Sequence, residues 1–320
     1  MNLNFATIWE EISDILPEKT AMICGNEKKT WAEYEKAASK LASALSASGL
    51  KAYSKAGLYL HNSNEYLEAQ FSIFKIGGTP INVNYRYKAD ELLYLLDNSD
   101  CEALFYQACY GDQINLIKNS LPKIKAWIEV DDGSPSLVSE SLNYSQLLED
   151  CEPMPRWERP EDIVYMLYTG GTTGMPKGVM YNQAEFISGM FKTVKAMGYF
   201  VPDDMDNLTE YVKDLDKKNE LPVNLVGCPL MHGTGMWLGC FLPHNLGGTV
   251  VTIPGLGFDP DKIWKECIRS NVTNIIIVGD AFARPMLDAL NTAEDKNTPY
   301  DLTSLQQITS SGVMWSSEVK

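Results

Sequence analysis

The sequence has few histidines, no closely paired cysteines and no long apolar run. Its apolar stretches are short, such as residues 275–278, whereas about 20 apolar residues are needed to cross a bilayer. We therefore expect no transmembrane segment. The seven cysteines are scattered, odd in number and never in a C-x-x-C pair, which argues against a disulfide framework and a zinc site. Buried reduced thiols are expected. Because residues 1–17 also lack the basic start of a secretory signal, the sequence predicts a cytoplasmic protein.

Basic side chains are also in deficit. The 320 residues include 27 Lys and Arg against 42 Asp and Glu, a formal net charge of −15. A nucleic acid would be repelled by this long-range field, so we expect no nucleic-acid partner. Any small anionic ligand must be held by local groups. With 45% hydrophobic residues, the composition is that of a globular protein with a sizeable core.

Strand-like and helix-like segments alternate along most of the chain. Apolar side chains at 3 to 4 residue steps predict helices, and short runs of apolar residues between them predict strands. This alternation is typical of an α/β fold with mainly parallel sheets. The expected helices are 30–49, 65–76, 89–96 and 259–270; the expected strands are 57–60, 80–83, 103–106, 163–168, 223–226, 249–253, 272–278 and 305–309.

Two segments depart from this alternation. Residues 134–159 are rich in Ser, Pro and Glu, and residues 201–221 carry an excess of acidic side chains. We expect the first to be a surface connection and the second a solvated insertion.

One glycine- and threonine-rich loop carries the strongest functional signal. Residues 168–178 read Tyr-Thr-Gly-Gly-Thr-Thr-Gly-Met-Pro-Lys-Gly. Glycine lets backbone N–H groups approach an anion closely, threonine hydroxyls add donors, and Lys177 adds a positive charge. The sequence therefore predicts a phosphate cradle, which an acidic protein needs all the more because its net charge repels a triphosphate.

This loop differs from the Walker phosphate loop. In G-x-x-x-x-G-K-S/T the loop runs into a helix, whereas here Pro176 replaces the second glycine and Gly178 replaces the hydroxyl residue. Residues 179–181 are more strand-like than helical, so we expect the loop to join two strands. A flexible hairpin without a ligand is the structural alternative.

Residues 168–178 resemble the signature of the adenylate-forming (AMP-binding) enzymes, which include acyl-CoA synthetases, adenylation domains of peptide synthetases and firefly-type luciferases. The commoner form of the signature has serine in place of Gly170. Further matches follow in order at residues 68–96, 229–233 and 310–314, so that the resemblance covers nearly the whole chain. The sequence around residues 278–283 is most similar to that of fatty-acid or steroid-side-chain acyl-CoA synthetases.

The resemblance implies a layered αβαβα arrangement with mainly parallel sheets, as in the large N-terminal domain of these enzymes. Residues 1–320 would be a truncated form of that domain, with subregions of roughly 1–160 and 161–320. The C-terminal cap domain with its catalytic lysine has no counterpart in the sequence, and neither have the magnesium-binding glutamate and the ribose-binding aspartate. Turnover by this fragment is therefore expected to be impaired.

The resemblance also implies an activity: ATP-dependent conversion of a hydrophobic carboxylic acid to acyl-AMP, followed by thioester formation with coenzyme A. ATP, coenzyme A and a fatty or steroid acid would be the substrates. Mg²⁺ would accompany ATP, with unknown protein ligands. An inactive nucleotide- and acyl-binding module, or an adenylating enzyme with another acceptor, are the alternatives. The oligomeric state stays open.

Site residues follow from the same resemblance. Lys177, Thr172 and Thr173 would be catalytic, through contacts with the phosphates. The nucleotide would be bound by Thr169, Gly170, Gly171, Thr172, Thr173, Gly174, Lys177, Ser311, Gly312, Val313 and Met314. The acid would be bound by His232, Gly279, Asp280 and Ala281.

Two of these residues allow other interpretations. His232 could be a general base, a metal ligand, a hydrogen-bonded structural residue or a wall of the acyl pocket. A base is unnecessary because a carboxylic acid is already ionised at pH 7, and no carboxylate is spaced for metal binding, so we favour the pocket wall. Asp280 could instead cap a helix over residues 281–290, the more frequent role of such a residue, or meet a hydroxyl or keto group of the acid.

Overall fold

The computed structural model describes residues 3–170, 175–196, 202, 205–255 and 257–320. The chain divides into two compact units that interleave along the sequence. The first unit comprises Met1–Glu11, Ala32–His61 and Glu65–Met205, and the second comprises Ile12–Trp31, Asn62–Asn64 and Asp206–Lys320. The last crossing between them lies at residue 205, and the expected subregions of roughly 1–160 and 161–320 stay a prediction.

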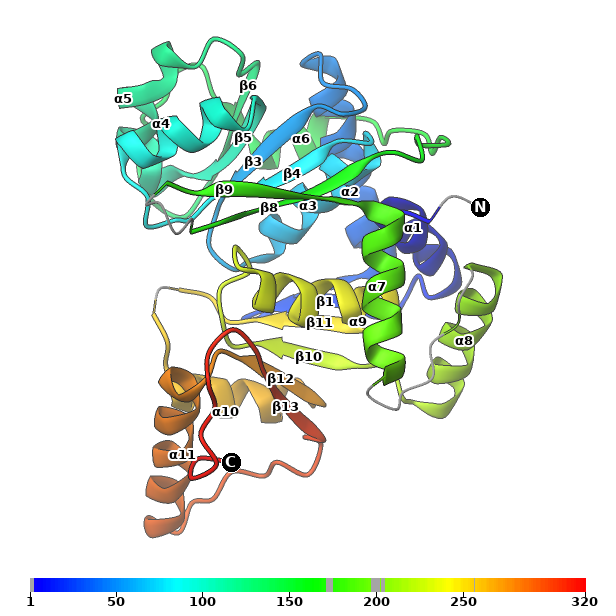
Figure 1. Ribbon diagram of the computed structural model, residues 1–320, viewed down its shortest axis with the longest axis vertical. Coiled ribbons are helices and arrows are strands. Elements are labelled where there is room, and N and C mark those ends of the chain that lie inside the picture. Colours follow the sequence, from blue (N-terminus) through cyan, green and yellow to red (C-terminus); the bar gives the residue numbers. More distant parts are fainter. Residues whose placement is uncertain (1–2, 171–174, 197–201, 203–204, 256) are drawn as a thin grey trace. The chain divides into compact units, whose positions relative to one another are not determined.

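A mainly parallel sheet forms the centre of the first unit (Figure 1). Within the described residues it has seven strands, in the order β7-β6-β5-β3-β4-β8-β9. Neighbouring strands are parallel, except that β9 runs antiparallel to β8 at the edge. The strands are β3 (Lys55–Tyr59), β4 (Thr79–Asn82), β5 (Cys101–Gln107), β6 (Ala126–Val130), β7 (Leu142–Asn143), β8 (Val164–Thr169) and β9 (Lys177–Asn182).

Helices connect these strands, as the alternating pattern predicts. They are α2 (Trp31–Ala47), α3 (Asn64–Lys75), α4 (Ala89–Asn98), α5 (Gly111–Ile117), α6 (Tyr144–Asp150) and α7 (Gln183–Ala196), preceded by α1 (Phe5–Ile15). Helix α2 ends at a glycine: Gly49 has φ +85°, its N–H donates to Ser46 O, and Leu50 N–H donates to Leu45 O. This is the Schellman arrangement, which satisfies the last carbonyls of a helix.

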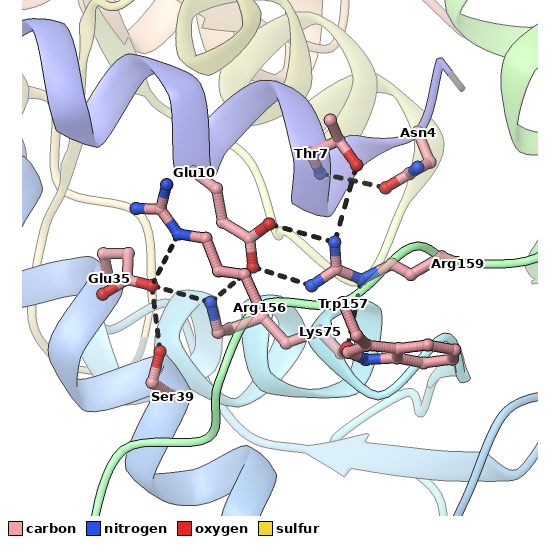
Figure 2. Close-up of polar contacts among 9 residues, drawn as sticks. All are labelled: Asn4, Thr7, Glu10, Glu35, Ser39, Lys75, Arg156, Trp157 and Arg159. Carbon is pink, nitrogen blue, oxygen red and sulfur yellow. Dashed lines mark hydrogen bonds and ion pairs between the residues drawn. The ribbon is translucent and has the colours of Figure 1, made fainter. Parts of the chain in front are cut away.

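A buried cluster of charges joins the N-terminal helix to the rest of the first unit (Figure 2). The Glu10 carboxylate contacts Lys75 Nζ at 2.6 Å and Arg159 Nη2 at 2.7 Å, and these three side chains are at most 5% exposed. Lys75 Nζ also lies 2.8 Å from Glu35 Oε1. Burial raises the pKa of Glu10, but the hydrogen bond from Arg159 and the charges of Lys75 and Arg159 outweigh it and hold the pKa below its usual value.

The second unit is built on another mainly parallel sheet (Figure 1). Its six strands, counted over the described residues, follow the order β13-β12-β10-β11-β1-β2, and β2 is antiparallel to β1. The strands are β1 (Thr20–Cys24), β2 (Glu27–Thr30), β10 (Val223–Val226), β11 (Thr249–Thr252), β12 (Asn274–Ile277) and β13 (Gln307–Ser310). The helices are α8 (Met205–Lys218), a π-helix (Thr234–Phe241), α9 (Leu242–Asn245), α10 (Pro260–Arg269) and α11 (Asp280–Asp295).

The expected α/β fold with mainly parallel sheets is confirmed, and several boundaries agree closely. Strand β10 has the predicted bounds. Helix α10 begins as predicted, because the Asp259 carboxylate accepts hydrogen bonds from the N–H groups of Asp261 and Lys262 at 3.0 and 3.3 Å and Pro260 occupies the first helical position.

Both segments that depart from the alternation contain structure that the sequence analysis missed. In residues 201–221, helix α8 buries Leu208, Val212 and Leu215, so the prediction of a solvated insertion was wrong for this part. Three to four residues separate these leucine and valine side chains, which places them on one face of a helix. Residues 134–159 contain α6, and Arg159 at their end is buried by its pairing with Glu10.

None of the described helices combines the length and apolarity that a bilayer span requires. All seven cysteines lie in the described part of the chain, and no disulfide joins any of them. Four are buried as expected, but Cys109 is exposed and Cys24 and Cys151 are half-buried.

Candidate functional site

The glycine-rich loop joins two antiparallel strands, as predicted. Strand β8 ends at Thr169 and β9 begins at Lys177, and these two residues are register partners. Thr169, Gly170 and Lys177 are exposed. Gly171, Thr172, Thr173 and Gly174 lie outside the described residues, so their predicted phosphate contacts stay predictions. Because β8 is parallel to β4, the loop leaves from the carboxyl edge of the sheet, where open α/β sheets bind ligands.

Side chains from neighbouring elements hold both ends of the loop. The side chain of Asn82, the last residue of β4, accepts from Tyr168 N at 2.9 Å and donates to Tyr168 O at 3.3 Å. The hydroxyl of Tyr168 donates to Asn98 Oδ1 at 2.9 Å, and burial raises the pKa of Tyr168 to about 12, so the phenol stays protonated. On the other side, the Tyr94 hydroxyl donates to Pro176 O at 3.4 Å.

Gly178 is required by close packing within this hairpin. A Cβ at this position would lie 2.8 Å from Met166 Sδ and 2.8 Å from Tyr168 Cε2. Only glycine lets β9 approach β8 at this point, so the last glycine of the signature serves the strand pairing.

Residues 229–233 of the second unit, which include His232, lie between β10 and the π-helix. His232 is exposed, its N–H donates to Pro229 O at 3.2 Å, and its carbonyl accepts from Met236 N at 2.9 Å. A Cβ at Gly235 would collide with Pro229 O, so this glycine lets the chain fold back tightly. π-Helical turns are rare overall but are often found at functional sites. That His232 borders a pocket stays a prediction.

Asn62, which the sequence analysis did not single out, fixes this same segment. Its Nδ2 donates to Cys228 O at 2.9 Å and its Oδ1 accepts from Leu230 N at 2.8 Å. The side-chain amide thus pairs with the backbone on both sides of Pro229, as a neighbouring strand would. An asparagine soon after a strand was the available signal, but its partners lie more than 160 residues away in the sequence.

Gly279 and Asp280 occupy the corner between β12 and α11. Gly279 is the N-cap residue, with φ 60° and ψ −162°, and no side chain caps the helix there. The expectation that Asp280 caps the helix was therefore wrong, because Asp280 is already its first residue. Its carboxylate Oδ1 accepts from Ser316 N at 2.9 Å. The next residue, Ala281, is exposed.

The predicted nucleotide-binding residues 311–314 follow β13 directly. Ser311 N donates to Ile277 O at 3.4 Å, Gly312 has φ +88°, and the side chains of Val313 and Met314 are exposed. Since β13 is parallel to β12, this segment and the Gly279 corner lie at the carboxyl ends of adjacent strands. The structure thus brings together six predicted residues of the second unit, namely Gly279, Asp280, Ser311, Gly312, Val313 and Met314.

Candidate metal ligands are scattered in the described ranges. These ranges contain no group of three or more His, Cys, Asp or Glu side chains that could hold a metal ion.

Comparisons with known proteins agree with this arrangement. The family model described as AMP-binding enzyme matches residues 9–320. The chain is 35% identical over 325 residues to a 3-oxocholest-4-en-26-oate–CoA ligase of Rhodococcus rhodochrous, covering 100% of this chain and 57% of that protein. It is 34% identical over 327 residues to a medium/long-chain-fatty-acid–CoA/3-oxocholest-4-en-26-oate–CoA ligase of Mycolicibacterium smegmatis, again covering 100% of this chain and 57% of the relative.

The fold is likewise shared with a solved structure. The N-terminal domain of FACL13 from Mycobacterium tuberculosis superimposes with a TM-score of 0.78 at 18% identity, covering 99% of this chain and 71% of the other. The chain spans a little over half the length of the curated relatives it matches. A family match over nearly all of its residues, together with the signature loop between β8 and β9, shows that the chain belongs to the AMP-binding enzymes.

Proposed function

We propose that this chain carries the nucleotide- and acyl-binding part of an acyl-CoA synthetase, which activates a hydrophobic carboxylic acid with ATP. The observation that carries the proposal is the signature loop, whose ends are fixed at the carboxyl edge of the first sheet by Asn82, Asn98 and Tyr94. The names of the two ligases above, which act on fatty and steroid acids, support that class of acid for this chain.

The proposed reaction has two steps. A carboxylate oxygen of the acid attacks the α-phosphorus of ATP, so that a P–O bond forms and the bond to pyrophosphate breaks. The thiol of coenzyme A then loses its proton and attacks the acyl carbon, which forms the thioester and releases AMP. The first step needs little covalent help, so positioning and charge stabilisation dominate.

The chain's own residues would bind and orient the reactants. Thr169, Thr172, Thr173 and the backbone amides of the loop would hold the β- and γ-phosphates, and Lys177 would follow the charge onto the departing pyrophosphate. His232 would line the acyl pocket. Mg²⁺ would enter on the phosphates of ATP, and no step above depends on a protein ligand for it.

Two further statements belong to this proposal. The seven cysteines, none of which is in a disulfide, support a cytoplasmic location. The acceptor is proposed to be coenzyme A because the relatives above are named as CoA ligases.

The test combines nucleotide binding with isotope exchange. The purified chain is expected to bind Mg·ATP, and exchange of labelled pyrophosphate into ATP is expected to require a fatty or steroid acid. Lys177→Ala and Thr172→Ala should weaken both, whereas Lys36→Ala, which changes an exposed lysine on α2, should not. Binding without exchange would favour the inactive-module alternative, and absence of nucleotide binding would refute the proposal.

A further inference from the structure

The N-terminus of α11 and the segment after β13 are fastened together by hydrogen bonds. Ser316 N donates to Asp280 Oδ1 at 2.9 Å, and Asp280 N donates to Met314 O at 3.3 Å. One residue earlier, Gly279 N donates to Ser310 Oγ at 2.8 Å. We call the two Asp280 contacts the Asp280 latch. It closes both ends of the short stretch 314–316 onto a single residue.

The second oxygen of Asp280 is also occupied. Arg284, one turn along α11, places Nη2 3.1 Å from Asp280 Oδ2 and 3.4 Å from Ser316 Oγ. The backbone and hydroxyl of Ser316, together with the charge of Arg284, lower the pKa of Asp280, so the carboxylate is ionised at neutral pH. Both of its oxygens therefore have partners within the protein.

Gly279 allows the two segments to come this close. A Cβ at Gly279 would lie 2.7 Å from Met314 O and 3.1 Å from Val313 Cβ, and its φ of +60° is a conformation that other residues rarely adopt. The contact therefore depends on backbone approach at this corner as well as on the carboxylate.

Residues 313 and 314 present apolar side chains to solvent. Val313 is 62% exposed and Met314 is 80% exposed, although the backbone of Met314 is held by Asp280. Exposed apolar side chains at the carboxyl ends of adjacent parallel strands are suited to the flat apolar face of a purine base.

We infer that Asp280 is a positioning residue for the adenine nucleotide, acting through Met314 and Ser316, and is not a contact for the acid. This inference rests on the proposed function and revises the predicted role of Asp280. Removing the carboxylate releases Ser316 N and loosens the surface on which the base would lie. The nucleotide affinity falls, and the affinity for the acid does not change.

The experiment measures the two ligands separately with the full chain. Calorimetric titration with AMP and with dodecanoate is compared for wild type, Asp280→Ala, Asp280→Asn and Arg284→Ala. Asp280→Ala loses a hydrogen bond to a charged group, so its affinity for AMP falls about tenfold. Its affinity for dodecanoate is unchanged. Asp280→Asn retains the acceptor for Ser316 N and restores AMP binding. Arg284→Ala, which leaves that acceptor in place, has little effect.

A structural readout accompanies the titrations. Hydrogen exchange at the Ser316 amide becomes faster in Asp280→Ala and stays slow in Asp280→Asn. If Asp280→Ala does not fold, Ser316→Pro removes the donor from the opposite side and is expected to weaken AMP binding in the same way.

Three results would overturn the inference. These are unchanged AMP affinity in a folded Asp280→Ala, a change in the affinity or preference for acids instead, or failure of Asp280→Asn to restore AMP binding. If the wild-type chain binds no AMP, the proposed function itself is refuted. If wild type binds AMP and Asp280→Ala binds it equally well, only the role of the Asp280 latch is refuted.

Discussion

The side chain of Asn82 pairs with both backbone polar groups of Tyr168. It accepts from Tyr168 N at 2.9 Å and donates to Tyr168 O at 3.3 Å. Asn82 directly follows Ile81, which is the register partner of Met166. The amide thus adds one more pair of hydrogen bonds to the β4–β8 ladder, immediately before the signature loop begins.

Replacing Asn82 with Asp should weaken the base of the loop. The acceptor for Tyr168 N is kept, but the donor to Tyr168 O is replaced by a second oxygen, so the unfolding free energy is expected to fall by about 1–3 kcal/mol. Mg·ATP affinity should fall as well. Asn98→Asp, which retains an acceptor for the Tyr168 hydroxyl, is the matched control. Urea unfolding and ATP titration measure both effects, and unchanged ATP binding by Asn82→Asp would contradict this role.

Two Gly→Ala changes in the first unit should have opposite signs. At Gly178 the new methyl group meets Met166 Sδ and the Tyr168 ring at 2.8 Å, so we expect destabilisation by about 1–3 kcal/mol. Gly189 lies in α7 with nothing within 4 Å of its would-be Cβ, so Gly189→Ala should stabilise by roughly 0.5–1 kcal/mol. Urea denaturation of both variants checks the pair. Equal effects would show that the β8–β9 packing is looser than described.

Lys75→Met should be among the most destabilising single changes in the first unit. It removes a buried cation that lies between Glu10 and Glu35, and breaking such a pair costs about 3–5 kcal/mol. Lys123→Met is the control, because that lysine is 59% exposed in its pair with Asp100 and should matter little. Chemical denaturation compares the two variants, and similar small losses would argue that water reaches the Glu10 cluster.

The stability of the second unit should decrease on mild acidification. His244 is fully buried, its Nε2 lies 3.0 Å from Ala21 O, and burial lowers its pKa from 6.5 to about 4. Between these values the unfolded chain binds the proton and the folded chain does not, so stability is lost as the pH falls. This term amounts to about 2 kcal/mol between roughly pH 7.5 and pH 5. Denaturant titrations at both pH values should show a smaller loss of unfolding free energy for His244→Asn than for wild type. An equal loss would exclude this histidine as the cause.

Local patterns were enough to predict the fold class and several elements. The cap at Asp259, the apolar strand 223–226 and the hairpin around the signature loop each depend on residues close in the sequence, so composition and spacing suffice for them. Helix α8 shows the limit of composition: its many charges indicated solvent exposure, although Leu208, Val212 and Leu215 recur at helical spacing and are buried.

The parts that sequence reasoning missed depend on distant partners. Arg159 is buried because Glu10 meets it across 149 residues, and Asn62 acts through Cys228 and Leu230. Asp280 has the sequence context of a helix cap. In the structure Gly279, which has a positive φ, is the N-cap residue, and the Asp280 carboxylate accepts from Ser316 N. Such pairings follow from topology, which a single sequence does not specify.

The position of β1 has a consequence for synthesis on the ribosome. Its parallel neighbour is β11, and Thr249 Oγ1 donates to Thr20 O across 229 residues. At typical rates of translation that partner arrives roughly 10 to 45 seconds later. Until then the β1–β2 hairpin has an open edge, which is the kind of surface that chaperones shield and that aggregation exploits.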